Sequence, residues 1–264
     1  MRAWCMASIL FFCSDALAYQ QVLTETGEVV AWPTHDVRFT VDDGFPMQWN
    51  GEDVESVVLA AKNPWESLEC SSLTLAYEGW TSGGQPDLFD THNGVYWIQD
   101  DWQFGSALMA ITLLEFSKFT GELRDADILV NNNQKTFDLD STCDNEGLNF
   151  DLQNILTHEF GHFVGLNHSD NAAATMFADT FEADCGKREL HPDDEAGFCA
   201  TYNREDPVDS EVAETRGAEP EEEPAEGCHS GRNVTFLPLL LLLVCVPMAR
   251  PKRALSGVHS VGRR

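Results

Sequence analysis

The segment that most constrains this chain runs from His158 to His168 and reads HEFGHFVGLNH. It fits the spacing H-E-x-x-H-x-x-G-x-x-H in full. Residues four apart lie on one face of a helix, so His158 and His162 can present two ring nitrogens to one metal ion. Gly165 allows a sharp turn with positive φ, which returns His168 as a third ligand. The segment therefore predicts a helix that ends near Gly165 and carries a metal site.

The residues before this motif support the same helix. Apolar side chains recur at helical spacing and predict a buried stripe formed by Leu152, Ile155, Leu156 and Phe163. Either Asn149 or Asp151 could cap the first turn.

Three histidines and one glutamate in this pattern predict a catalytic zinc site. Three neutral imidazoles leave one coordination position open for water, and zinc lowers the pKa of bound water to about 7 while it polarises a carbonyl group. Glu159 is expected to act as the general base on that water and then as the proton donor to the leaving amine. Met176 follows the third histidine closely. This placement resembles the Met-turn of the metzincins, which implies that its thioether forms an apolar floor beneath the imidazoles.

The sequences at the two ends of the chain are typical of segments that direct a protein to its cellular location. Residues 1–18 form a predicted signal peptide, with Arg2, an apolar stretch and Ala16-Leu17-Ala18 as the cleavage site, so we expect an exported protein. Residues 19–32 form a short N-terminal segment, 33–203 the catalytic domain and 204–227 an acidic, Glu/Pro-rich disordered linker. Residues 228–264 form a tail with an apolar run at 234–249, which is a marginal transmembrane helix followed by basic residues. This tail resembles the MYXO-CTERM sorting signals of myxobacterial surface proteins; the alternative is a plain tail anchor.

The net charge and the cysteine content limit which binding partners and which cellular compartment are expected. With 44 acidic and 16 basic residues, the net charge of −28 argues against a nucleic-acid partner. We expect a monomer whose contact with a membrane is made through the C-terminal tail alone. Four cysteines remain in the folded part, and an even number in an exported domain favours two disulfides. Three pairings are possible; we favour Cys185–Cys199 together with Cys70–Cys143.

The complete motif, with Met176 behind it and Ser169 directly after the third histidine, resembles the matrixins among the metzincin zinc endopeptidases, in a bacterial form. The resemblance covers about residues 33–203 and implies an α+β fold, with a twisted mixed sheet, an active-site helix and a small C-terminal subdomain ending in a helix. It implies strands near 37–41, 73–77, 95–98, 107–116 and 126–130, a helix over 54–65, and a last helix with Asp193 and Asp194 in its first turn. It also implies protein or peptide substrates that bind along an edge strand at 107–114.

Several alternatives stay open at this stage. Asp138, Asp140, Asp144 and Glu146 form either a solvated acidic surface or a calcium site. A second, structural zinc is not expected, because the region that would hold it offers His92 alone. The alternatives to an endopeptidase are a non-catalytic peptide-binding domain and a zinc hydrolase acting on cell-wall or other small substrates.

Overall fold

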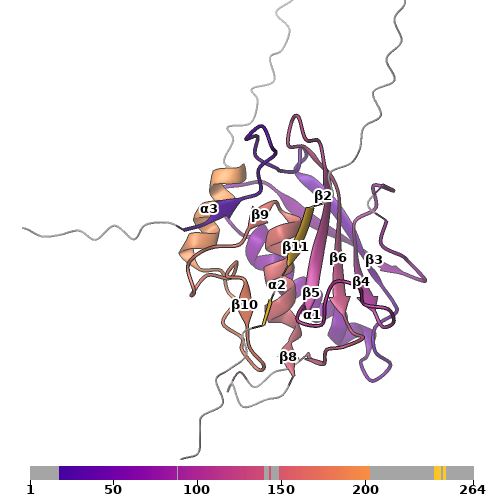
Figure 1. The fold of residues 1–264 in the computed structure, drawn as a ribbon. Coiled ribbons are helices and arrows are strands. Elements are labelled where there is room, and N and C mark those ends of the chain that lie inside the picture. The colour runs from indigo at the N-terminus through magenta and orange to yellow at the C-terminus, as the bar shows by residue number, and fades with distance from the viewer. Residues whose placement is uncertain are drawn as a thin grey trace, which may run out of the picture.

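The centre of the molecule is a mixed β-sheet with two helices packed against one face (Figure 1). The structure is a computed structural model, and it describes residues 18–87, 89–139, 143, 149–202, 241–244 and 246–247. The predicted α+β class is confirmed, with a mixed sheet and a helix that carries His158 and His162.

The main sheet has the strand order β11-β5-β6-β4-β2-β3. Its strands are β2 (Asp36–Asp42), β3 (Thr74–Thr81), β4 (Gly94–Ile98), β5 (Ala110–Phe116), β6 (Leu123–Asn131) and β11 (Leu241–Val244). β2 is parallel to β3 and β4, and β4 is parallel to β6. β5 is antiparallel to both of its neighbours, and β5 and β6 confirm the strands predicted near 107–116 and 126–130.

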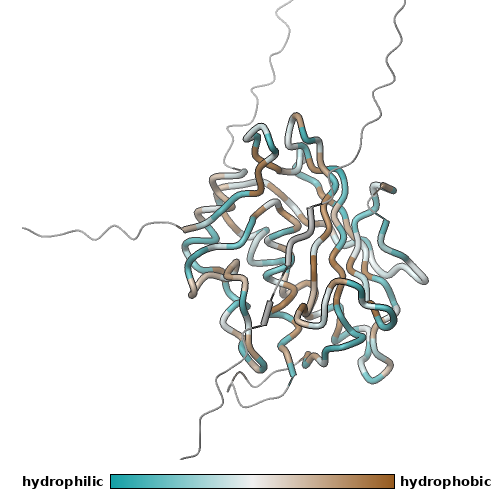
Figure 2. The backbone as a smooth tube through the Cα atoms, in the orientation of Figure 1, coloured by the Kyte–Doolittle hydropathy of each residue, from teal (hydrophilic) through white to brown (hydrophobic). Residues whose placement is uncertain are grey.

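The helices are α1 (Gly51–Glu66), α2 (Leu152–Phe163) and α3 (Pro192–Tyr202). Asn50 is the N-cap of α1, and its side chain accepts a hydrogen bond from the Asp53 amide at 2.9 Å. The main core lies between these helices and the sheet and contains fully buried Trp65 and Phe160. Figure 2 shows the hydrophobic stretches of chain gathered in the central strands and helices.

Three aromatic side chains fix α2 in place. The indole nitrogens of Trp65 and Trp32 donate to the carbonyl oxygens of Thr157 and Phe163, each at 2.8 Å. The Tyr202 hydroxyl donates to the Val164 carbonyl at 2.8 Å. α1, the N-terminal segment and α3 thus each hold the helix that carries the first two histidines.

Three short strand pairs complete the described structure. They are β1 (Gln20–Gln21) with β9 (Leu166–Asn167), β7 (Phe137–Asp138) with β8 (Phe150–Asp151), and β10 (Asp179–Thr180) with β12 (Val246–Pro247). The described part of the predicted membrane span at 234–249 is therefore extended and paired with other strands rather than helical. Within the described ranges, no helix combines the length and the apolar character needed to cross a membrane.

The disulfides correct the predicted pairing. Cys70 is bonded to Cys199 and Cys143 to Cys185. The prediction of Cys185–Cys199 and Cys70–Cys143 was wrong because it favoured the short loop between 185 and 199. In the fold, α3 instead brings Cys199 to the chain that follows α1, with 5.6 Å between the two Cα atoms.

Candidate metal centre and active site

The structure brings the three histidines of the motif together. α2 carries His158 and His162, and the turn after it returns His168 to the same place. One ligand atom from each lies within 4.8 Å of the others, and the Nε2 atoms of His162 and His168 are 3.2 Å apart. Gly165 makes the turn possible with φ +87°, and a Cβ there would lie 2.3 Å from the Val30 carbonyl oxygen. Both the conformation and the close approach therefore require glycine.

Backbone carbonyl groups set the tautomers of the two helix histidines. His158 Nδ1 lies 2.6 Å from the Thr175 carbonyl oxygen, and His162 Nδ1 lies 2.8 Å from that of Leu166. A carbonyl oxygen only accepts, so each Nδ1 carries the proton and each Nε2 keeps a free lone pair. His158 Nε2 is buried and has no hydrogen-bond partner among the described residues. An orphaned lone pair of this kind fits a metal ligand.

The electrostatics keep all three rings neutral. Burial lowers the pKa of His158 and His162 well below the ordinary value, and it lowers the pKa of His168 to about 4. The Lys187 ammonium adds to this lowering, since it lies 3.4 Å from His158 Nδ1 and donates to the Phe177 carbonyl oxygen. Metal binding needs neutral imidazoles, so the charge pattern suits a cation with three nitrogen ligands.

Glu159 is fully buried beside this cluster. Its Oε2 accepts a hydrogen bond from the Thr112 hydroxyl at 2.7 Å, and its Oε1 has no partner among the described residues. Burial raises the pKa of Glu159 to about 8, although the bond from Thr112 and the charge of Lys187 act in the opposite direction. A buried carboxylate with one unsatisfied oxygen and a raised pKa can exchange a proton near neutral pH.

The loop after the third histidine packs Met176 against α2. A Cβ on Gly161 would lie 2.2 Å from Met176 Sδ, so the thioether contacts the helix between the two helix histidines. Asp194 holds this loop, because its Oδ1 accepts from the Met176 amide at 2.9 Å and its Oδ2 from the Thr175 amide at 2.7 Å. The structure thus places Met176 and the Thr175 carbonyl relative to α2 through one buried carboxylate.

Sequence reasoning missed these supporting roles. Asp193 and Asp194 lie in the first turn of α3 as expected, but both are buried and their side chains hold the site. Asp193 Oδ2 accepts a 2.6 Å hydrogen bond from the hydroxyl of Ser169, the residue after the third histidine. Thr112 and Lys187 carried no pattern that marked them, since each reaches the site through the fold from a distant part of the chain.

The entry into α2 is also tightly held. Of the two candidate caps, Asp151 is the N-cap, and its side chain accepts from the Asn154 amide at 2.7 Å. Asn149 instead bridges Thr136 and Asp138, at 2.7 and 2.8 Å.

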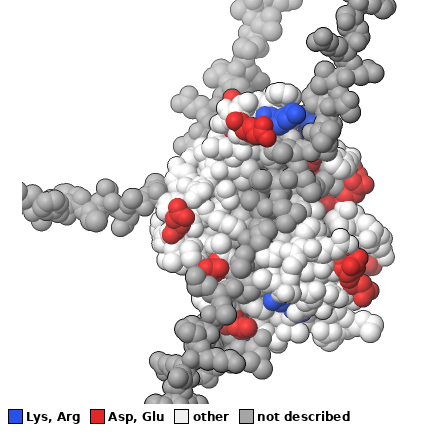
Figure 3. All heavy atoms as spheres, viewed as in Figure 1, with Lys and Arg blue, Asp and Glu red and all other residues white. Residues whose placement is uncertain are grey.

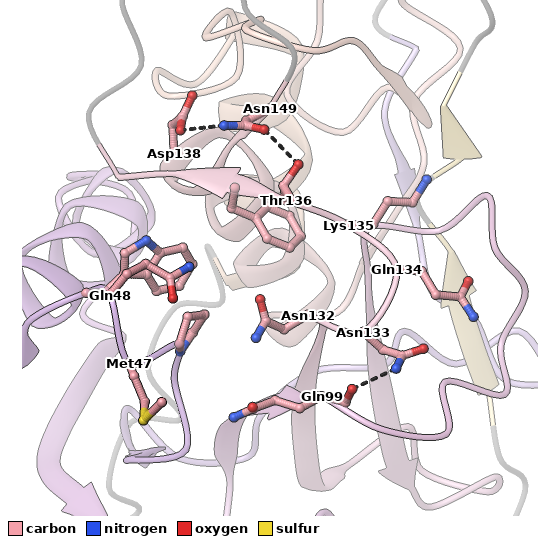
Figure 4. Close-up of a pocket in the computed structure, with 13 residues that line it drawn as sticks. Met47, Gln48, Gln99, Asn132, Asn133, Gln134, Lys135, Thr136, Asp138 and Asn149 are labelled. Carbon is pink, nitrogen blue, oxygen red and sulfur yellow. Dashed lines mark hydrogen bonds between the residues drawn. The ribbon is translucent and has the colours of Figure 1, made fainter.

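This bridge lines a pocket of about 760 Å³ rich in carboxamide side chains (Figure 4). None of the three histidines lines this pocket, so it is separate from the candidate metal centre. Of the four residues predicted as a calcium site, Asp138 takes part in the bridge, while Asp140, Asp144 and Glu146 lie outside the described residues. On the face shown in Figure 3, acidic side chains outnumber basic ones and are spread in separate groups.

Comparisons with known proteins agree with this geometry. Residues 32–203 match the family model described as Matrixin. Mouse stromelysin-3 is 28% identical over 176 residues, which is 66% of this chain and 32% of that protein. Human matrix metalloproteinase-19 is 44% identical over 66 residues, 24% of this chain and 13% of that protein, and human matrix metalloproteinase-27 is 38% identical over 66 residues, 25% and 13%. The chain thus spans between 13% and 32% of the length of these relatives.

Proposed function

Because this chain belongs to the matrixin family, we propose that it is a zinc-dependent endopeptidase that hydrolyses peptide bonds in proteins or peptides. The observation that carries the proposal is the arrangement of buried, unsatisfied groups. The unpartnered Nε2 atom of His158 lies near the ligand atoms of the other two histidines. The next residue in α2, Glu159, has an unpartnered carboxylate oxygen, Oε1.

The residues divide the chemistry between them. His158, His162 and His168 would hold the zinc ion, which when bound supplies a Lewis acid that polarises a carbonyl group and acidifies water. Glu159 takes the proton from the attacking water and then delivers it to the leaving amine. Thr112 orients the Glu159 carboxylate through Oε2, which leaves Oε1 available to the attacking water. Met176 and Asp194 keep the Thr175 carbonyl in place, and that carbonyl fixes the tautomer of His158.

The test uses the zinc-loaded full chain, a diverse peptide mixture and mass spectrometry of the products. Glu159→Gln is the matched variant, because it keeps the shape of the side chain and touches no metal ligand. We expect wild type to cut internal peptide bonds, and Glu159→Gln to retain one zinc ion per chain while losing at least about 100-fold in rate. A chelator should abolish the cuts and added zinc should restore them. A folded, zinc-bound wild type that leaves every peptide intact would refute the proposal.

Export is part of the same proposal. The apolar N-terminal stretch with its Ala16-Leu17-Ala18 site supports it, and so does the presence of two disulfides, which persist in oxidising compartments. Expression with residues 1–18 intact should yield a mature N-terminus at Tyr19 outside the cytoplasm, and N-terminal sequencing would check this. A cytoplasmic protein that keeps Met1 would contradict export.

A further inference from the structure

β5 lies beside the candidate active site, and one of its two backbone edges is not covered by β6. β6 covers the other edge, and the Thr112 side chain on β5 reaches the Glu159 carboxylate at 2.7 Å. β10 begins two residues after Phe177, on the loop whose Thr175 carbonyl contacts His158. β5 and β10 are thus both tied to residues of the candidate active site, and an extended chain that pairs with a backbone edge of each lies beside that site.

Both edges are occupied by one segment near the C-terminus. β11 pairs antiparallel with β5 and places Leu241 opposite Leu114 and Leu243 opposite Thr112. β12 follows directly and pairs parallel with β10, with Val246 opposite Asp179. Figure 1 shows β11 beside β5 and, in yellow and without a label, the short β12 near β10.

We propose that residues 241–244 and 246–247 are an intramolecular ligand of the β5 and β10 edges, and that they take the place of a substrate strand and compete with substrates for these edges. The inference deepens the proposed function and rests on it, since competition has meaning only if the β5 and β10 edges bind polypeptide substrates. The segment reads LLLVCVP and has no charge, so the surrounding acidic domain does not repel it. About 40 residues separate it from Tyr202, a length that can extend over 100 Å. The number of intervening residues is therefore enough for the segment to reach β5 and β10.

The pairing of β11 with β5 determines which backbone amides of the segment donate hydrogen bonds to β5. The Asn131 amide donates to the Met109 carbonyl at 2.8 Å, so the polar groups of Met109 face β6. Backbone groups alternate sides along a strand, so those of Thr112 and Leu114 face away from β6, toward β11. Their partners Leu243 and Leu241 must therefore donate to β5, whereas the amide of Leu242 faces away.

Because the backbone amides alternate in direction along β11, two neighbouring residues supply a matched pair of variants. Leu243→Pro removes an amide that bonds to β5 and so breaks the ladder opposite Thr112. Leu242→Pro makes the same chemical change one residue away, where the lost amide faces outward, and proline is tolerated at such edge positions. Both are made in the full chain, so the length and composition of the tail stay the same.

The first measurement is steady-state cleavage of a peptide by the zinc-loaded full chain. A tethered competitor raises the apparent KM and leaves kcat unchanged. We expect Leu243→Pro to lower the apparent KM about tenfold or more, in keeping with the high effective concentration of tethered ligands, and Leu242→Pro to stay near wild type. The effect should not depend on enzyme concentration. Equal KM values in all three proteins would overturn the proposal.

The second measurement does not depend on activity. Amide hydrogen exchange of Thr112 and Leu114 is followed in the Glu159→Gln background, which prevents cutting of the tail. We expect protection of both amides, lost in Leu243→Pro and kept in Leu242→Pro; equal exchange in both proline variants would refute docking. If wild type and Leu243→Pro both lack peptidase activity while the exchange difference persists, the proposed function fails and the docked segment stands. A Glu159-dependent cut of wild type between Leu243 and Val246 would support the same placement.

Discussion

Under the proposed function, the hydrogen bond from Thr112 to Glu159 should set the pH at which peptidase activity appears. The bond is 2.7 Å long and lies between two fully buried residues. It favours the ionised carboxylate, so it opposes the burial that raises the pKa of Glu159 to about 8. Thr112→Val removes the hydroxyl and nearly conserves the shape of the side chain. The pKa of Glu159 must therefore rise in this variant, and the general base is ionised only at higher pH.

The size of the effect follows from the charge on the acceptor. A hydrogen bond to a charged group contributes about 1.5–3 kcal/mol, and each pKa unit corresponds to about 1.4 kcal/mol. The acidic limb of the kcat/KM profile should therefore move up by about 1–2 pH units. On that limb the rate falls about 10- to 100-fold, whereas above it the rates of wild type and variant converge.

The assay is kcat/KM of the zinc-loaded full chain against pH, with Thr112→Ser as the control that keeps the hydroxyl. Zinc content and thermal unfolding are measured on each variant, so that misfolding is recognised separately. Coincident acidic limbs for wild type and Thr112→Val, in proteins of equal zinc content, would refute the reasoning. So would a shift in Thr112→Ser as large as that in Thr112→Val.

Three further predictions concern stability. Gly161→Ala should lower the free energy of unfolding by about 1–3 kcal/mol, because the new Cβ overlaps Met176; urea unfolding would show it, and unchanged stability would contradict this packing. Cys70→Ser should cost about 5 kcal/mol by the chain-entropy estimate for the 129-residue separation to Cys199; a loss below about 1 kcal/mol in non-reducing denaturant would be inconsistent with it. Without metal, stability should fall as pH drops from about 6.5 to about 4, because the unfolded state protonates His168 before the folded state does; a flat profile between pH 7 and 4 would contradict this.

The ligand set was predictable because its geometry is local. The spacing of His158 and His162 is a property of one helix, and the return of His168 depends on a single glycine turn three residues earlier. The buried stripe and the alternating apolar strands are short-range patterns of the same kind. These features therefore followed from neighbouring residues alone.

The groups that support the site could not be found in this way. Thr112 meets Glu159 only because β5 is packed against α2, across 47 residues of sequence. Asp194 resembles an ordinary acidic residue in the first turn of a helix, and its burial against the Met176 loop depends on where α3 lies. The predicted disulfide pairing was wrong for the same reason, because the pairing depends on the position of α3 in the fold and not on distance along the chain.

The two disulfides form nested loops, and this gives the domain a resistance to being cut apart. Cys143–Cys185 lies wholly inside Cys70–Cys199, and the inner loop contains all three histidines. A single break between residues 143 and 185 leaves the two fragments joined by two covalent links, and a break elsewhere between 70 and 199 leaves them joined by one. A nicked molecule therefore keeps α2, with its two histidines, and the following turn attached to the rest of the fold, and its fragments would separate only after reduction.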